Sequence, residues 1–115
     1  LKALARRHPS RAPMPRRLHL HDLEVDTESH QVWRAGQRIS LTAREYALLE
    51  YLMLHQGKVV HRVDILENVW DVHFNTTTNV VDVYINYLRR KIDKDANQKL
   101  LHTVFGVGYL LKAEA

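Results

Sequence analysis

The sequence predicts an α+β domain in which a small antiparallel sheet precedes three helices and a β-hairpin closes the chain. Short apolar alternations separated by turn residues occupy positions 18–41. Helical periodicity of apolar residues follows in three segments between positions 42 and 93, and two glycines then separate two further short apolar runs. A chain of 115 residues with 45% hydrophobic content is sufficient for one such domain with a single core.

Residues 1–17 have the composition of an extended linker between domains. Three prolines, Pro9, Pro13 and Pro15, disfavour a packed element. The basic residues of this segment are Lys2, Arg6, Arg7, Arg11, Arg16 and Arg17. Because the chain opens without methionine and enters such a linker, we expect it to be a fragment of a longer protein, with the folded domain at 18–115.

The composition limits location and partners. There is no cysteine, which fits a reducing compartment and removes disulfide and thiolate chemistry. No hydrophobic run approaches the ~20 residues that span a bilayer, and the amino terminus lacks the apolar core of a signal peptide. We therefore expect a cytoplasmic protein without a membrane partner.

The first folded segment alternates in the manner of short strands. Turn signals at 26–29 and 35–37 interrupt it, so we expect an antiparallel sheet of three or four strands. The paired apolar positions are Leu18 and Leu20, Leu23 and Val25, Val32 and Trp33, and Ile39 and Leu41.

Two helices are expected next. Thr42 and Glu45 have the T-x-x-E spacing of a capping box, in which hydroxyl and carboxylate each accept from an exposed amide, so a helix begins there. Gly57 supplies its left-handed stop. A shorter helix is predicted over about residues 61–70 from its apolar spacing.

The third helix, within 78–93, is the candidate binding element. Val81, Ile85, Leu88 and Ile92 recur at i, i+4, i+7 and i+11, which makes one apolar stripe that faces a core. The remaining surface carries amide, phenol and guanidinium groups suited to base edges and phosphates. A competing interpretation stays open, because basic residues near a helix C-terminus also complement its dipole, and a charged face is often only solvated. The residues are Asp82, Asn86, Tyr87, Arg89, Arg90 and Lys91.

Residues 100–104 and 109–112 predict the closing hairpin, with Gly106 and Gly108 allowing positive φ in the turn. A sheet, three helices and a hairpin in this order are the winged form of the helix-turn-helix. In that form the third helix enters the major groove, and the hairpin lies against the adjacent backbone or minor groove.

Charge restricts how such a domain would bind DNA. The net charge is +4, but six of the 17 basic residues precede Leu18, which leaves 11 against 13 acidic residues in the folded part. That part is formally −2. Binding must therefore depend on a local cluster around Arg89, Arg90 and Lys91, with help from the basic arm.

From about Leu18 to Leu111 the chain resembles the DNA-binding effector domain of OmpR/PhoB-type response regulators. The resemblance implies a four-stranded amino-terminal sheet, a three-helix core with a carboxy-terminal wing, and a transcription factor of a bacterial two-component system. It also implies an N-terminal receiver domain joined through the Pro/Arg segment. The matching motifs are Leu41-Thr-Ala-Arg-Glu-Tyr-Ala-Leu-Leu49, Gly57-Lys-Val-Val60, Ile65-Leu-Glu-Asn-Val-Trp70, Thr78-Asn-Val-Val-Asp-Val-Tyr-Ile85, Leu88-Arg-Arg-Lys-Ile92 and Thr103-Val-Phe-Gly-Val-Gly-Tyr109.

The resemblance also implies which residues face DNA. Several relatives have basic residues where this chain has Asn86 and Tyr87, so we expect more amide and aromatic contacts here, and Tyr84 and Tyr87 pack against neighbouring elements in the alternative interpretation. Asp82 is expected to orient Arg89 or another cation. The predicted DNA-binding residues are Asn79, Tyr84, Asn86, Tyr87, Arg89, Arg90, Lys91, Thr103 and Tyr109.

The wing departs from the family pattern. Many relatives have an arginine that reaches the minor groove at the position before the first glycine, and this chain has Phe105. We expect Phe105 to pack against the base of the wing, because an exposed phenylalanine lowers solubility without attracting phosphate. The alternative is a contact with the sugar edge of the groove.

Residues 71–77 correspond to a loop that some family members use to contact RNA polymerase. Its residues are Asp71, Val72, His73, Phe74, Asn75, Thr76 and Thr77. Thr76, Thr77 and Thr78 suit either capping of the third helix or a bond to phosphate at the helix end, and we expect capping. The family resemblance further implies tandem direct-repeat half-sites and a weak or DNA-induced homodimer.

Catalysis and metal binding find no support in the sequence. The eight histidines are scattered and lack metal-ligand spacing, and no serine has a recognisable nucleophile motif around it. We therefore expect no enzyme activity, cofactor or metal. The serious alternative to DNA binding is a winged-helix module that binds proteins, which the charge of −2 keeps open.

Overall fold

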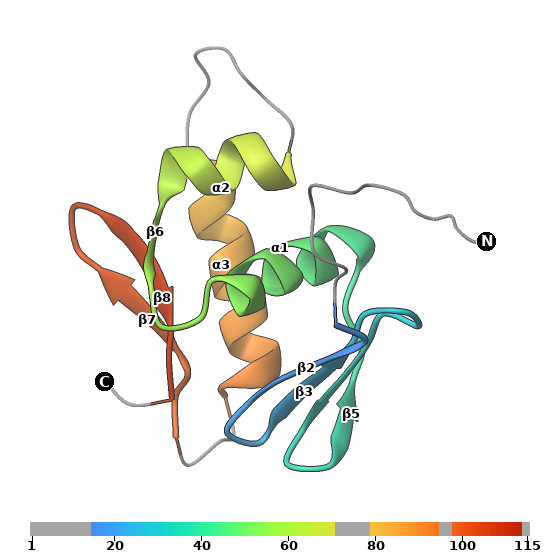
Figure 1. The fold of residues 1–115 in the computed structure, drawn as a ribbon. Helices are drawn as coiled ribbons and strands as arrows, with labels where there is room; N and C mark the ends of the chain where they lie inside the picture. The colour runs from blue at the N-terminus through green and yellow to red at the C-terminus, as the bar shows by residue number, and fades with distance from the viewer. Residues whose placement is uncertain (1–14, 71–78, 95–97, 114–115) are drawn as a thin grey trace.

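The computed structural model describes residues 15–70, 79–94 and 98–113 (Figure 1). A four-stranded sheet comes first, three helices form the centre, and a second small sheet closes the domain on the other side. The predicted α+β winged architecture is confirmed. The elements are β2 (Arg17–Leu20), β3 (Leu23–Asp26), β4 (Gln31–Arg34), β5 (Gln37–Ile39), α1 (Ala43–Leu54), β6 (Val59–His61), α2 (Arg62–Val69), α3 (Asn79–Ile92), β7 (Leu101–Val104) and β8 (Gly108–Leu111).

The amino-terminal sheet is an antiparallel meander in the order β2-β3-β4-β5. Between β3 and β4, Asp26 Oδ1 accepts from the amides of Glu28 (2.9 Å) and Ser29 (3.2 Å), which closes the turn. Ala35 and Gly36 have φ of +54° and +80° and form the two-residue turn between β4 and β5. Strand β2 begins at Arg17, the last residue of the predicted linker, and residues 1–14 lie outside the described part.

Helix α1 begins as its capping box predicts. The Glu45 amide donates to Thr42 Oγ1 (3.2 Å), and the Thr42 amide donates to Glu45 Oε1 (2.9 Å). The helix ends at Leu54, and Gly57 follows with φ of +85°. The Gly57 amide donates to the Leu111 carbonyl (2.8 Å), so this turn also attaches α1 to the carboxy-terminal sheet.

The carboxy-terminal sheet has three strands in the order β6-β8-β7, and β6 was not predicted. A strand of three residues between two helices is too short to show a period-2 pattern. The expectation that Gly108 allows positive φ is wrong, because among the described glycines only Gly36, Gly57 and Gly106 have positive φ. A Cβ on Gly108 would lie 1.9 Å from the Val60 carbonyl oxygen, so glycine is needed for the close approach of β6 to β8.

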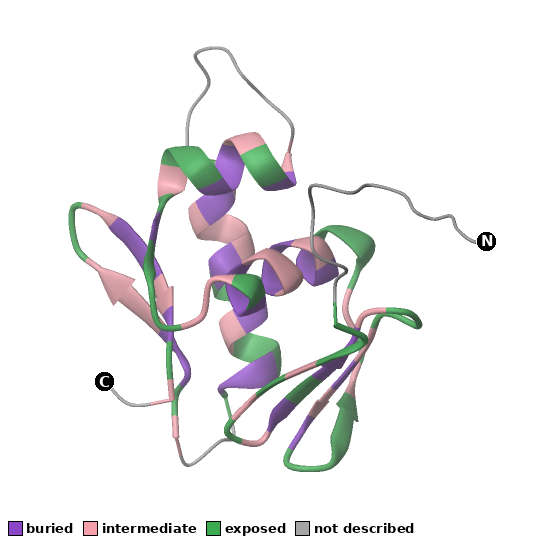
Figure 2. Cartoon of the chain, viewed as in Figure 1, coloured by how far each residue is buried: buried purple, intermediate pink, exposed green. Residues whose placement is uncertain are grey.

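Helix α3 runs through the centre of the core, crossed by α1 (Figure 2). Val81, Ile85, Leu88 and Ile92 are all at most 2% exposed, which confirms the predicted apolar stripe. They pack with Leu48, Leu49 and Leu52 of α1, Ile65 of α2 and Leu111 of β8 in one core cluster. No helix in the described ranges is long and apolar enough to cross a membrane.

Candidate nucleic-acid interface

The polar side of α3 opposite the core is a continuous surface. Asn79, Val83, Asn86 and Arg90 recur at i, i+4, i+7 and i+11, out of phase with the buried stripe, and Tyr87 lies beside them at 38% exposure. We call these five residues the outer face of α3. Val83 was missing from the predicted DNA-binding residues, although the helical period that placed the others also places it here.

Tyr84 packs as its alternative interpretation states. Its ring contacts Trp70 edge-on at a centroid distance of 5.2 Å, and it contacts Tyr87 in the same manner at 5.2 Å. The guanidinium of Arg44 lies over Trp70, 5.4 Å from the ring centroid. Tyr84 therefore packs between Trp70 and Tyr87. Tyr87 itself remains partly exposed to solvent.

Lys91 points away from the outer face and toward the start of α1. Its Nζ lies 2.6 Å from Glu45 Oε1, and the Glu45 side chain is only 5% exposed. Burial alone raises the pKa of the Glu45 carboxyl, but the hydrogen bonds from Lys91 and Thr42 outweigh burial and hold that pKa below its ordinary value. This pair joins α3 to α1 and uses a cation that the sequence assigned to DNA.

Acid is therefore expected to weaken the domain through Glu45. Because its folded-state pKa is lowered, its contribution is present above the ordinary pKa of 4.5 and is lost as pH falls below that value. Glu45→Gln should lower the free energy of unfolding by roughly 1–2 kcal/mol at pH 7, and the deficit should shrink at about pH 3. Urea unfolding at both pH values measures this. Glu67→Gln on α2 is the control, and an equal Glu45→Gln deficit at both pH values would contradict the assignment.

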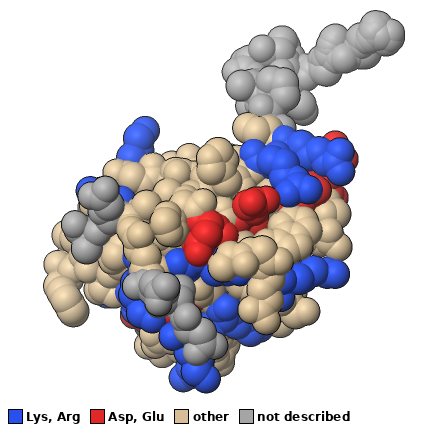
Figure 3. Space-filling model, turned by 90° about the horizontal axis from the view of Figure 1, so that it is seen from below, with Lys and Arg blue, Asp and Glu red and all other residues tan. Residues whose placement is uncertain are grey.

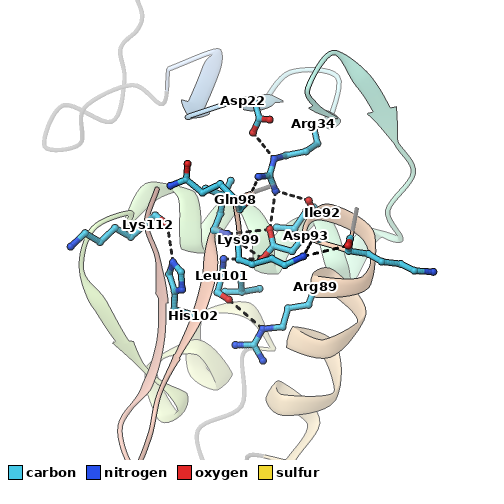
Figure 4. Close-up of polar contacts among 12 residues, drawn as sticks. Asp22, Arg34, Arg89, Ile92, Asp93, Gln98, Lys99, Leu101, His102 and Lys112 are labelled. Carbon is cyan, nitrogen blue, oxygen red and sulfur yellow. Dashed lines mark hydrogen bonds and ion pairs between the residues drawn. The ribbon is translucent and has the colours of Figure 1, made fainter. Parts of the chain in front are cut away.

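Arg89 attaches the wing to α3. Its Nε donates to the Leu101 carbonyl at 3.3 Å, as Figure 4 shows, and its Nη2 donates to Thr103 Oγ1 at 2.5 Å. The guanidinium also lies over the Tyr109 ring, 5.7 Å from the centroid. Two predicted DNA contacts, Arg89 and Thr103, are thus brought together, but they bond to each other.

Asp82 forms the second connection between α3 and the wing. The Tyr109 hydroxyl donates to its carboxylate, and Arg62 Nε of α2 donates to Asp82 Oδ1 at 2.9 Å. Burial acts to raise the Asp82 pKa, but these two hydrogen bonds hold the pKa below its ordinary value. Of the two expected partners, Asp82 has another cation, Arg62, and not Arg89. Tyr109 is 4% exposed, so its hydroxyl is used inside the domain.

A buried polar cluster holds the C-terminal end of α3 (Figure 4). Arg34 of β4, with its side chain 6% exposed, lies 2.8 Å from Asp93 Oδ1 and donates to the Ile92 carbonyl at 2.6 Å. Its Nε lies 2.5 Å from Asp22 Oδ1, and Nη2 donates to the Gln98 carbonyl. Asp93 in turn accepts from the amide of Leu101 at 3.0 Å. One guanidinium therefore connects the amino-terminal sheet, the end of α3 and the start of the wing.

The expectation that Phe105 packs against the base of the wing is wrong. Its side chain is 90% exposed at the tip of the β7-β8 hairpin. The Val107 amide donates to the Val104 carbonyl at 3.0 Å, and Gly106 has φ of +78°, so Phe105 is the second residue of a β-turn. A side chain at that corner of a turn points outward and finds no surface to pack on.

The surface charge is mixed. Figure 3 shows Lys and Arg in separate groups on the face seen from below, with acidic side chains between some of them. Among the described residues, no group of three or more His, Asp or Glu could hold a metal ion. The proposed polymerase loop 71–77 and the threonine caps at 76–78 lie outside the described part of the chain.

Comparison with known proteins identifies the family. The family model for "Transcriptional regulatory protein, C terminal" matches residues 36–111. The chain belongs to this family. The resemblance to OmpR/PhoB-type DNA-binding effector domains is thereby confirmed.

Individual relatives agree with this assignment. Over 91 residues, which are 79% of this chain and 40% of the relative, the sequence is 50% identical to the transcriptional regulatory protein CusR of Escherichia coli. It is 43% identical to the response regulator MprA of Mycobacterium tuberculosis over 113 residues, which are 97% of this chain and 49% of MprA. This chain thus spans less than half the length of these curated relatives.

A solved relative shows the same fold with DNA. The DNA-binding domain of Klebsiella pneumoniae RstA, in complex with the RstA box, superposes with a TM-score of 0.78 at 27% identity. The match covers 87% of this chain and all of that chain. The winged-helix arrangement of this family is therefore the arrangement found here.

Proposed function

We propose that this chain binds double-stranded DNA sequence-specifically, as the output domain of a bacterial response regulator. The observation that carries the proposal is the outer face of α3. This surface lies on a helix whose apolar stripe is in the core, whose Asp82 is bonded to Arg62 and Tyr109, and whose C-terminal end is held by the Arg34 cluster. A preorganised helix of this kind can enter a major groove without losing internal contacts. Family membership and the RstA complex with its box support the same function.

Different residues of the outer face suit different parts of the DNA. The Asn86 amide suits adenine, which accepts and donates through adjacent atoms, and Val83 suits a thymine methyl. Asn79 and Tyr87 border these two, and the exposed Arg90 is the phosphate contact. Arg89, Thr103 and Tyr109 position the wing, in place of the direct DNA contacts expected from the sequence. Lys91 would reach phosphate only by leaving Glu45.

Selection from a randomised duplex pool tests this function. The 115-residue chain is titrated against the pool at two salt concentrations, and bound duplexes are sequenced. A short enriched motif whose affinity falls with salt supports the proposal. If no motif is enriched and binding disappears at physiological salt, the proposal is contradicted in favour of a winged-helix module that binds proteins or a domain that binds DNA only when a missing partner makes it dimerise.

Variants tested on the selected duplex then distinguish phosphate contacts from base contacts on α3. Arg90→Ala should lower affinity equally for all sequences and reduce the salt slope by about 1, because one phosphate contact is lost. Asn86→Ala should instead cost ~1–3 kcal/mol at one base pair and relax the preference there. Lys58→Ala, an exposed cation far along the chain from α3, is the control. A preference unchanged in Asn86→Ala would mean that α3 is oriented differently in the groove.

The whole regulator would add further parts. A receiver domain before residue 18 fits the lengths of CusR and MprA, because this chain matches less than half of each. Binding to tandem half-sites would make the domain a weak or DNA-induced homodimer. A contact with RNA polymerase through residues 71–77 and action in the cytoplasm belong to the same proposal. Comparing the affinity for one half-site with the affinity for a direct repeat measures whether two copies of the domain bind DNA cooperatively.

A further inference from the structure

The wing of this chain carries no lysine or arginine that could attract phosphate. Between Leu101 and Leu111 there is no Lys or Arg, and no Asp or Glu. The tip instead presents the sequence Val104-Phe105-Gly106-Val107, with the Phe105 side chain 90% exposed between two half-buried valines. Leaving so much apolar surface in water is unfavourable. A single exposed ring at a hairpin tip resembles the apolar side chains that minor-groove binding proteins insert between base steps.

The hairpin backbone that carries the ring is fixed before any partner binds. The tip turn is closed by the hydrogen bond from Val107 to Val104, and the strands behind it are paired Thr103 to Tyr109 and Val104 to Gly108. Thr103 accepts from Arg89 and the Tyr109 hydroxyl donates to Asp82, so this pair of wing residues is attached to α3 at two points. A fixed wing loses little conformational freedom on binding.

The attachment also determines where the ring lies relative to a bound duplex. Phe105 follows Thr103 by two residues, about 7 Å of extended strand, and Thr103 is bonded to α3 itself. The β7-β8 hairpin lies beside α3, on the side away from the amino-terminal sheet (Figure 1). With the third helix of a winged helix-turn-helix in the major groove, the hairpin lies against the adjacent backbone or minor groove.

We propose that Phe105 is an apolar wedge that enters the minor groove beside the site read by α3 and partly unstacks one base step there. This inference rests on the proposed DNA-binding function. The duplex partner is a flexible pyrimidine–purine step, TA or CA, because such steps are the least costly to open. Sequence preference at that position arises from deformability, without a hydrogen bond to a base.

The test uses the duplex recovered by selection, with 2-aminopurine at the flanking step as a reporter of unstacking. Phe105→Ala should weaken binding about tenfold, within the range for loss of an aromatic contact with bases, with an unchanged salt slope and no rise in 2-aminopurine fluorescence. Phe105→Arg should recover affinity while steepening the salt slope by about 1. Because the ring is exposed, both variants should unfold in urea at the wild-type midpoint.

Other results would overturn the wedge. If Phe105→Ala binds the selected duplex as tightly as the wild type, the wing makes no such contact, although the recovered motif leaves the proposed function standing. If Phe105→Ala loses affinity for a direct repeat but not for a single half-site, the ring contacts a second copy of the chain instead of DNA. Failure to select any motif would be a failure of the proposed function and is separately recognisable.

Discussion

Arg34→Ala is expected to lower the free energy of unfolding by about 3–5 kcal/mol, the range for removing one partner of a buried ion pair. The guanidinium is 6% exposed and the carboxylate of Asp93, 2.8 Å away, is 5% exposed. Alanine would leave that carboxylate buried without its cation and would also free the carbonyls of Ile92 and Gln98. Urea unfolding followed by circular dichroism measures the change.

Arg38→Ala is the matched control, because Arg38 is an exposed arginine on the adjacent strand β5. It should change the free energy of unfolding by less than about 0.5 kcal/mol. Arg34→Lys should fall between the two, since an ammonium keeps the charge but cannot reach four acceptors in one plane. A loss below 1 kcal/mol in Arg34→Ala would mean that water replaces the guanidinium and that the cluster does not hold α3.

The Arg34 cluster could not be predicted from the sequence, although the elements around it could. Local signals, such as the T-x-x-E capping box and the apolar stripe of α3, predicted their elements correctly because the interacting residues are a few positions apart. Arg34 and Asp93 are 59 positions apart, and each looks like an ordinary residue at the end of its element. Nothing in their spacing indicates that they meet.

The candidate binding surface was also predicted where the signal is local and missed where it depends on distant residues. Helical periodicity placed Asn86 and Arg90 on the outer face of α3, and Val83 follows from the same period. The family resemblance assigned Arg89 to DNA, and residue type assigned Lys91 and Tyr109. Their partners in the fold, Thr103, Glu45 and Asp82, decide their orientation, and these contacts cross between elements that only tertiary structure brings together. Phe105 was mispredicted because burial of an apolar side chain requires a neighbouring surface, which a turn corner lacks.

Gly108→Ala is expected to have the second large effect, a loss of about 3 kcal/mol in the free energy of unfolding, at the upper end for overpacking. An added Cβ would lie 1.9 Å from the Val60 carbonyl oxygen and 2.9 Å from the His61 Cα. Both are backbone atoms, so neither can move as a flexible side chain would. Strand β6 must separate from β8, which breaks the junction between α2 and the wing. Chemical unfolding gives the loss, and amide exchange at β6 shows whether it is local.

Gly106→Ala distinguishes sterics from backbone conformation. A Cβ at Gly106 would meet nothing within 4 Å, and only its φ of +78° is unfavourable for alanine. Its cost should be about 1–2 kcal/mol, without faster exchange at β6. If Gly108→Ala costs no more than Gly106→Ala, strands β6 and β8 can separate easily and the wing is not fixed to the helical core. The tip would then not be held rigidly, which would also remove the preorganisation on which the wedge at Phe105 depends.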